Sequence, residues 1–215
     1  MSRLGLFGGT FDPPHRAHRR LCEAARSHLG LDAVAVLPAS TPPHGKTPAA
    51  GAWHRWAMVV LAFRDAAGLI PSPRELERGG VSYTVQTLRE LVRERPGEIP
   101  YLIIGGDSYD DLSSWYCFEE ILELAHLAVV DRPGSEGTAR LRPEDRDRLA
   151  KPGTAPPDGR PAVYPVPMDP ADLAASSLRE ELAARKRPEG LDPLVYDYIA
   201  AHGLYGVGRH STGGI

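Results

Sequence analysis

Cysteine and long apolar runs are scarce in the 215-residue chain, and each scarcity narrows the class of protein. Cysteine occurs only at positions 22 and 117, without the spacing of metal ligands, so a disulfide framework is not expected. The longest apolar runs, such as residues 57–63, fall far short of the roughly 20 residues that span a membrane. The first residues enter an apolar strand without the layout of a signal peptide. We therefore expect a cytoplasmic protein with no membrane association.

The chain also carries no excess of basic residues. Lysine and arginine number 25 against 28 aspartate and glutamate residues, and the formal net charge is -3, so no basic field for nucleic acid is present. A small-molecule ligand fits better. The length suits one domain, which we place at residues 1–205. We expect residues 206–215, which offer no core residues, to be a disordered tail. Whether the chain forms a homo-oligomer stays open.

The stretch from Leu4 to His18 carries the strongest signal in the chain. An apolar run is followed, in order, by Gly8, Gly9, Thr10, Phe11, Asp12, Pro13, Pro14, His15 and His18. This order predicts a strand, a stiff loop and the start of a helix, because glycine lets the backbone approach a ligand and proline fixes φ. In the first turn of a helix the two histidines share a face, where free N–H groups and the helix dipole favour phosphate. We predict a polyphosphate site here.

Two other interpretations of the histidine pair stay open. The pair could bind zinc, although a His-x-x-His spacing without cysteine or a third nearby ligand is weak evidence for that metal. The pair could also lie on a helix surface without any function. The preceding glycines and the proline loop favour phosphate over both.

Strand-like and helix-like patterns alternate along the rest of the chain. Further strands are predicted at residues 33–37, 69–72, 99–104, 127–130 and 162–166. Helices are predicted from the first motif to Gly30 and at residues 53–66, 85–92, 118–125, 143–149, 172–187 and 191–205, with a charged turn at 75–80. The alternation predicts an α/β fold: a doubly wound, Rossmann-like parallel sheet of about six strands with helices on both faces. The site should lie at the carboxyl ends of the strands.

The run from Gly8 to His15, followed by His18, resembles the signature of the nucleotidyltransferases with a His-x-Gly-His motif. The closest resemblance is to the bacterial nicotinate-nucleotide adenylyltransferases, which use ATP and Mg²⁺ to adenylylate nicotinate mononucleotide, giving deamido-NAD and pyrophosphate. It implies small-molecule nucleotides as ligands. The residues it assigns to ATP in this motif are Gly8, Gly9, Thr10, Phe11, His15 and His18. One position departs, because the glycine of the family is Ala17 here.

A second stretch, at residues 176–179, resembles the Ser-Ser-Thr-x-x-Arg element with which the family binds ATP phosphates. Aligned on Arg179, the threonine is Ser176 and the two serines are Ala174 and Ala175, so one hydroxyl and the guanidinium remain. Arginine suits bidentate contact with phosphate, and a helix start adds N–H groups. An ordinary capped helix is the alternative, since Ser177 to Glu180 also fits a capping box.

The remaining ligand contacts are predicted on loops at strand ends. Gly105 and Asp107 follow a predicted strand, an arrangement that suits the hydroxyl groups of a ribose. The resemblance implies that Thr84, Trp115 and Tyr116 bind the nicotinate end of the acceptor. Lys46, in a proline-rich loop after the second strand, is expected on the same rim. Gln86 stands where the family usually has an acid.

The reaction that the resemblance implies needs no covalent intermediate. His15, His18 and Arg179 would stabilise charge on the transferring and leaving phosphates, and the triphosphate would supply most ligands of Mg²⁺, because the sequence shows no protein cage for the metal. Two alternatives remain. The chain could be a nucleotidyltransferase for another phosphorylated small molecule, or a nucleotide-binding protein with impaired catalysis, which the alanines at 17, 174 and 175 would explain.

Overall fold

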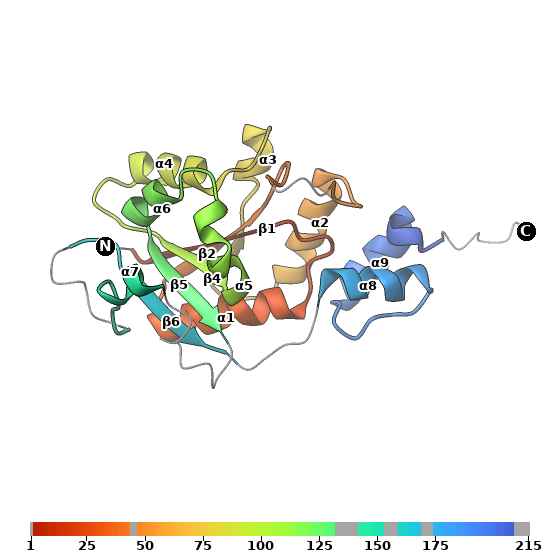
Figure 1. Cartoon of the computed structure of the whole chain (residues 1–215). Coiled ribbons are helices and arrows are strands. Elements are labelled where there is room, and N and C mark those ends of the chain that lie inside the picture. Colours follow the sequence, from red (N-terminus) through yellow and green to blue (C-terminus); the bar gives the residue numbers. More distant parts are fainter. Residues whose placement is uncertain (1, 44–46, 132–141, 153–158, 169–173, 209–215) are drawn as a thin grey trace, which may run out of the picture.

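The computed structural model describes residues 2–43, 47–131, 142–152, 159–168 and 174–208. Within these ranges six parallel strands form one sheet in the order β3-β2-β1-β4-β5-β6 (Figure 1). The strands are β1 (Leu4–Gly9), β2 (Ala33–Pro38), β3 (Leu69–Pro71), β4 (Tyr101–Gly105), β5 (His126–Asp131) and β6 (Val163–Pro167). This confirms the doubly wound parallel sheet that the sequence predicts.

Helices connect the strands and cover the sheet (Figure 1). They are α1 (Arg16–Leu29), α2 (Ala52–Phe63), α3 (Arg74–Arg78), α4 (Thr84–Glu94), α5 (Gly106–Asp110), α6 (Phe118–Leu124), α7 (Pro143–Arg146), α8 (Ala175–Ala183) and α9 (Pro193–His202). Two 3₁₀ turns, η1 (Leu112–Ser114) and η2 (Leu204–Gly206), complete the described elements. In this part of the chain no helix is long and apolar enough to cross a membrane.

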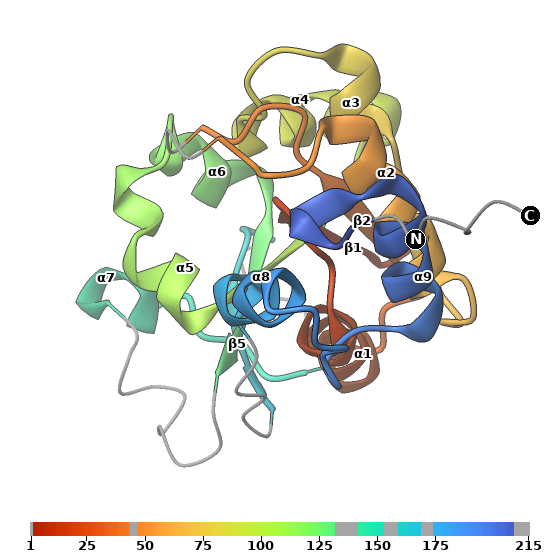
Figure 2. The ribbon, with the colours of Figure 1, turned by 90° about the vertical axis from the view of Figure 1, so that its right-hand side faces the viewer.

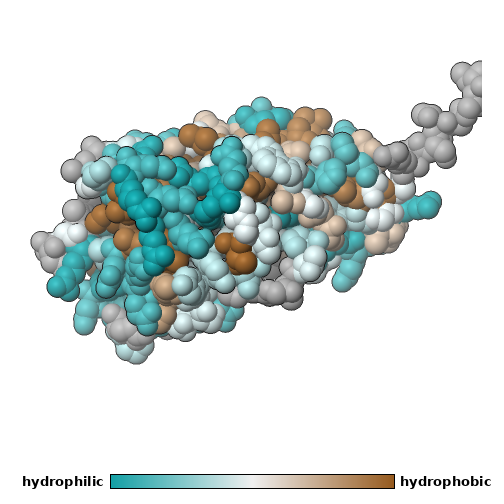
Figure 3. Space-filling model, turned by 90° about the horizontal axis from the view of Figure 1, so that it is seen from above, coloured by the Kyte–Doolittle hydropathy of each residue, from teal (hydrophilic) through white to brown (hydrophobic). Residues whose placement is uncertain are grey.

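Alternation along the central strands decides which helices cover which face. Phe7 and Ile103 belong to one buried cluster, together with α1, α2, α8 and α9. Leu6 and Leu102, their neighbours in the sequence, belong to a second cluster with α4, α5 and α6. Because successive residues of a strand point to opposite faces, two apolar layers form on one sheet. Seen from above, the face that α3, α4 and α6 present to solvent is largely hydrophilic (Figure 3).

The structure differs from two local predictions. Residues 75–80 were expected to be a charged turn, but Arg74–Arg78 form α3. Its Glu75 is buried and accepts the hydroxyl of Thr87 in α4 over 2.7 Å, a tertiary contact that composition does not reveal. The capping box from Ser177 to Glu180 is also wrong. Ala174 is the N-cap of α8 and makes no side-chain cap bond, so Ser177 lies inside the helix.

The last helices lie at the carboxyl end of the sheet. In Figure 2, α8 lies between α5 and α1 in front of the strands, with α9 beside it. Val207, two residues past the predicted domain end, is buried in the first apolar cluster with 8% of its surface exposed. The packed chain therefore extends at least to Val207, and residues 209–215 of the predicted tail lie outside the described residues.

Candidate active site

The site begins where β1 ends, at the point where the order of the sheet reverses. The chain places β2 on one side of β1 and β4 on the other, and doubly wound sheets bind ligands at the carboxyl edge beside such a switch point. Because β1 and β4 are parallel neighbours, their last residues, Gly9 and Gly105, lie at the same edge of the sheet. The motif loop (residues 10–14) and the predicted ribose contacts after β4 are therefore on one rim.

The two glycines at the end of β1 have different surroundings. Gly8 is exposed, and a Cβ atom there would have only the carbonyl oxygen of Leu37 near it, at 4.0 Å. A Cβ atom at Gly9 would lie 3.1 Å from the ring of Phe11. Gly8 thus leaves the strand end open to a ligand, whereas Gly9 makes room for Phe11. Since the Phe11 side chain is buried, only its backbone is left to contact a ligand.

His15 and His18 contact each other, although not as two helical residues. His15 is the N-cap of α1, with φ of -146° and ψ of 171°, so the prediction that it lies in the first helical turn is wrong. Its N–H donates to Nδ1 of His18 over 3.1 Å, and the ring centroids are 3.7 Å apart. Because Nδ1 of His18 accepts this bond, the neutral ring carries its proton on Nε2.

The first N–H groups of α1 are mostly used within the chain. The N–H of Arg16 donates to the carbonyl of Gly190, and that of His18 to the carbonyl of His15, both over 3.0 Å. Of the first three residues of the helix, Ala17 alone has an N–H without a partner among the described residues. The residue that replaces the glycine of the family thus carries the N–H most available to an anion.

Burial keeps both imidazoles neutral near neutral pH. It lowers the pKa of His15 to about 4, and it lowers the pKa of His18 well below the usual value, with a smaller contribution from His15. Nδ1 of His15 is buried and has no hydrogen-bond partner in the described part of the chain. The pair therefore offers neutral N–H donors, and a bound phosphate would raise both pKa values because an anion favours the charged imidazole.

Asp12 anchors the motif loop to segments far away in the sequence. Its carboxylate accepts the N–H groups of Ala49 over 2.7 Å and Ala50 over 3.0 Å, and the hydroxyl of Tyr205 over 2.7 Å. Nη1 of Arg179 donates to its backbone carbonyl over 2.7 Å. No local sequence pattern indicates the contact between Asp12 and Tyr205, because the two residues are 193 positions apart.

Arg55 is a further residue of the site whose role the sequence alone does not reveal. It is 1% exposed, and its guanidinium donates to the backbone carbonyls of Thr10 over 2.7 Å, Ser40 over 2.9 Å and Ala50 over 3.1 Å. Burial lowers its pKa, and the nearby Asp12 opposes that shift. Arg55 therefore ties the motif loop to the loop after β2. The one sequence signal for this role is that Arg55, a charged residue, stands in an otherwise largely apolar helix.

The second predicted element does reach the motif loop. Arg179 on α8 contacts the Asp12 carbonyl through Nη1, which also lies 3.9 Å from the Asp12 carboxylate. Its Nε and Nη2 have no partner among the described residues, so they are available to phosphate oxygens. Ser176 is exposed in the first turn of the same helix. The structure thus joins Asp12 and Arg179, which are 167 positions apart in the sequence.

The predicted acceptor residues lie at the starts of α4 and α6. Thr84 is the first residue of α4, and the ring of Tyr83 before it lies 4.6 Å from the ring of Tyr116. Tyr116 is 55% exposed, and Trp115 is partly buried against the second apolar cluster. The structure therefore brings three of the predicted residues to one place. Lys46 lies outside the described residues.

The predicted ribose contacts lie where β4 passes into α5. A Cβ atom at Gly105 would have only the side chain of Leu21 near it, at 3.9 Å, so the backbone there is accessible. Asp107 is exposed in the first turn of α5. Both are on the rim that carries the motif loop.

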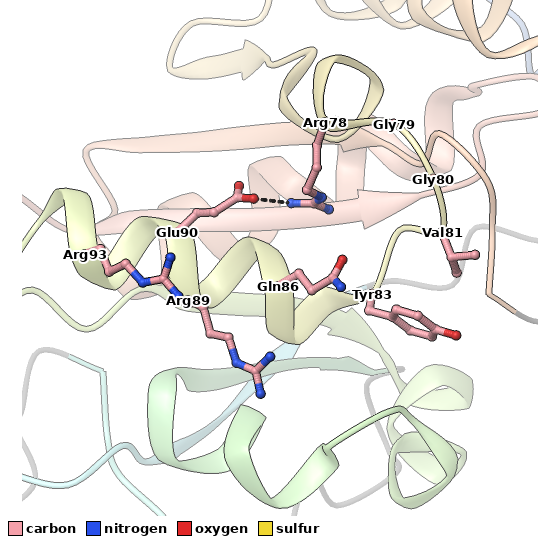
Figure 4. A pocket seen from close by; sticks show the side chains of 9 residues that line it. All are labelled: Arg78, Gly79, Gly80, Val81, Tyr83, Gln86, Arg89, Glu90 and Arg93. Carbon is pink, nitrogen blue, oxygen red and sulfur yellow. Dashed lines mark hydrogen bonds and ion pairs between the residues drawn. The ribbon is translucent and has the colours of Figure 1, made fainter.

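A charged hollow with a volume of about 470 Å³ lies over the outer surface of α3 and α4, and Tyr83, the neighbour of Thr84, is part of its lining (Figure 4). Arg78 donates to Glu90 across it over 2.9 Å, and Arg89 at its edge donates to Glu120 over 2.7 Å. None of the predicted catalytic or binding residues lines this hollow. Gln86 does, so the position where the family has an acid faces it (Figure 4).

An imidazole pair and an arginine near the switch point place the chain in the class of doubly wound α/β proteins whose ligand site lies at the carboxyl edge of the sheet. Comparison with known proteins is consistent with this class. The chain matches the model of the cytidylyltransferase-like family over residues 6–181. It is 42% identical over 211 residues to a protein of Chromobacterium violaceum, covering 95% of this chain and 99% of that one, and 37% identical over 206 residues to one of Herpetosiphon aurantiacus, with the same coverage. Both relatives are named probable nicotinate-nucleotide adenylyltransferase.

Solved structures resemble the fold along nearly the whole chain. The Plasmodium falciparum nicotinic acid mononucleotide adenylyltransferase complexed with NaAD superimposes with a TM-score of 0.75 at 17% identity, covering 97% of this chain and 99% of that one. The same enzyme complexed with APC gives a TM-score of 0.72. The chain belongs to the cytidylyltransferase-like family and, within it, to the nicotinate-nucleotide adenylyltransferases.

Proposed function

We propose that this protein transfers the adenylyl group of ATP to nicotinate mononucleotide, giving deamido-NAD and pyrophosphate, a step of NAD biosynthesis. The relatives that carry this name match the chain over 95% of its length. The observation that carries the proposal is the convergence of His15, His18 and Arg179 on the motif loop at the switch point of the sheet. The cytoplasmic location stays a prediction, and the oligomeric state stays open.

The mechanism follows from charge and position. A phosphate oxygen of the mononucleotide forms a bond to the α-phosphorus of ATP, and the bond from that phosphorus to pyrophosphate breaks. A phosphate monoester is already anionic near neutral pH, so positioning and charge neutralisation can carry the rate without a strong base. The His18 Nε2–H, the His15 ring, and Nε and Nη2 of Arg179 would donate to oxygens of the transferring and leaving phosphates. Such preorganised donors stabilise charge that develops in the transition state.

Further contacts would orient the two nucleotides. We propose that Gly8, Gly9, Thr10 and the backbone of Phe11 contact ATP, with Ser176 on its phosphates and Gly105 and Asp107 at its ribose. At the other end, the Trp115 ring would stack on the pyridine ring of the acceptor. Backbone N–H groups at Thr84 and Tyr116 would hold its carboxylate.

We propose that Mg²⁺ enters with ATP. Among the described residues no group of three His, Cys, Asp or Glu side chains could hold a metal ion, and the Asp12 carboxylate is occupied by three donors. Phosphate oxygens are ligands that Mg²⁺ prefers, so the triphosphate itself would supply most of the coordination. Bound there, the ion neutralises charge on the phosphates.

Pyrophosphate release from ATP, measured with a panel of acceptors, tests the function. We expect release with nicotinate mononucleotide and much less with nicotinamide mononucleotide, because the acceptor residues offer N–H groups suited to a carboxylate. Equal rates with both acceptors would refute the substrate assignment. Release only with another phosphorylated molecule would favour a different transferase. ATP binding without release for any acceptor would favour a nucleotide-binding protein with impaired catalysis.

A further inference from the structure

We propose that Tyr205 and Asp12 are positioning residues for the adenylyl transfer. The phenol of Tyr205, in the last described turn of the chain, holds the buried Asp12 carboxylate and so fixes the motif loop between His18 and Arg179. The proposal rests on the proposed function. It gives a role to η2, which lies where the sequence predicts the end of the last helix.

The motif loop needs outside support because it contains a strained residue. Phe11 has φ of 52°, in the left-handed region that a residue with a bulky side chain seldom adopts. Such conformations persist only where surrounding structure holds them. The Phe11 ring packs with its centroid 4.9 Å from that of His18 and 5.6 Å from that of Phe7. A loop that relaxed at Phe11 would therefore move the His18 ring as well.

Asp12, the next residue, supplies that support. One carboxylate oxygen accepts the Ala50 N–H and the Tyr205 hydroxyl, and the other accepts the Ala49 N–H. The residue is 6% exposed, and hydrogen bonds shielded from water are electrostatically stronger than exposed ones. Its backbone carbonyl accepts Nη1 of Arg179. Asp12 is thus the point where the strained loop, the loop after β2, α8 and η2 meet.

Tyr205 is held in place by its own surroundings. It also lies in the left-handed region, with φ of 54°, and η2 passes in front of the ends of β1 and β2 (Figure 2). The next residue, Gly206, packs near Ala183 at the end of α8, the helix that carries Arg179. Burial and the Asp12 carboxylate raise the pKa of Tyr205, so the phenol stays protonated and remains a donor.

Tyr205→Phe tests the contact, because it removes one hydroxyl and keeps the ring. We expect kcat to fall about 10- to 100-fold, since a displacement of about 1 Å at reacting groups can cost on the order of 10²-fold in rate. The KM for nicotinate mononucleotide should change less than about twofold, because the acceptor residues lie on other elements. Thermal melts identify a temperature at which each variant is folded, and all rates are measured there.

Tyr198→Phe is the matched control. The Tyr198 hydroxyl lies 2.9 Å from Nδ1 of His54, a residue of α2 that has no proposed catalytic or binding role. Tyr198 and Tyr205 are both partly buried. We expect wild-type kcat in this control. A wild-type kcat in Tyr205→Phe, or an equal loss in both variants, would overturn the positioning role.

A double-mutant cycle with Asp12→Asn separates positioning from general stabilisation. The amide would turn an N–H₂ donor toward a backbone donor, so we expect Asp12→Asn to lower kcat at least as much as Tyr205→Phe. If both act through one contact, Tyr205→Phe adds no further loss in the Asp12→Asn background. Fully additive losses would overturn the proposal. If the wild type releases no pyrophosphate with any acceptor, the proposed function fails. The positioning role is then tested by the affinity of each variant for ATP. Equal ATP affinity in Tyr205→Phe and Tyr198→Phe would overturn that role too.

Discussion

The N–H of His15 donates to Nδ1 of His18 over 3.1 Å, a bond between the N-cap and the third residue of α1. It settles which nitrogen of His18 accepts and leaves Nε2–H as the donor. The two rings meet because His15 has extended backbone geometry before the helix begins, not because of helical periodicity. The two rings therefore form one unit, and a substitution of either histidine tests the role of the pair.

We expect His18→Ala to lower kcat by roughly 10² to 10³, the usual effect of losing one preorganised donor to a transition state. ATP must be saturating, so that the loss is not one of binding alone. His28→Ala is the matched control, because His28 is an exposed histidine in the last turn of the same helix. Wild-type turnover in His18→Ala would refute a catalytic role for this imidazole.

Stability should fall as the pH is lowered from about 6.5 toward 4. The pKa of His15 is lowered to about 4 in the fold, so between these values the unfolded chain binds a proton that the folded chain does not. The contribution is fully present above the unfolded pKa and decreases by up to about 1.4 kcal/mol per pH unit below it. His18 and His126, whose pKa values are also lowered by burial, act in the same direction.

Urea unfolding at several pH values between 5 and 7.5 measures this slope. We expect a shallower slope in His15→Ala than in the wild type, with His28→Ala as the control for removal of an exposed imidazole. An unchanged slope in His15→Ala would show that this ring does not titrate below its usual range.

Arg55→Met should destabilise the fold strongly. The change leaves the carbonyls of Thr10, Ser40 and Ala50 without their buried donor, and each hydrogen bond to a charged group is worth about 1.5–3 kcal/mol. We expect a loss of at least 3 kcal/mol in the free energy of unfolding. Arg64→Met, at the exposed end of the same helix, should cost less than about 1 kcal/mol. Similar losses in both variants, measured by urea unfolding, would contradict this account.

Ala17→Gly restores the residue that the family pattern has at this position. Glycine lowers helix stability by about 1 kcal/mol relative to alanine, so the melting temperature should decrease. The Ala17 N–H has no partner among the described residues, and removal of the methyl group would let an anionic ligand approach it more closely. We expect a modest rate increase. A gain of many hundredfold would mean that Ala17 cripples catalysis, and the nucleotide-binding alternative would then be preferred.

Much of the candidate site could be predicted because short stretches carry it. The motif from Gly8 to His18 and the pair of Ser176 and Arg179 each combine residue types suited to phosphate within a few positions. The structure adds that α8 reaches the motif loop through Arg179 and that the ring of Tyr83, the residue before Thr84, lies 4.6 Å from that of Tyr116. The tyrosine and the carboxylate that lock the loop were not predictable, because their partners are 193 positions apart.

The sequence by itself determined the order of the six strands and of the longer helices, the two-sided burial of Leu6 and Phe7, and the position of the glycine-rich strand end. Periods of 2 and 3.6 residues and the fixed φ of proline are local properties that act wherever the chain goes. Only the tertiary structure decided that His15 caps α1, that Arg55 is buried on three carbonyls, and that Tyr205 holds Asp12. These contacts depend on which distant segments meet at the carboxyl edge of the sheet. Burial at this edge keeps the His15 ring neutral and keeps the Tyr205 phenol protonated, so that it donates a hydrogen bond.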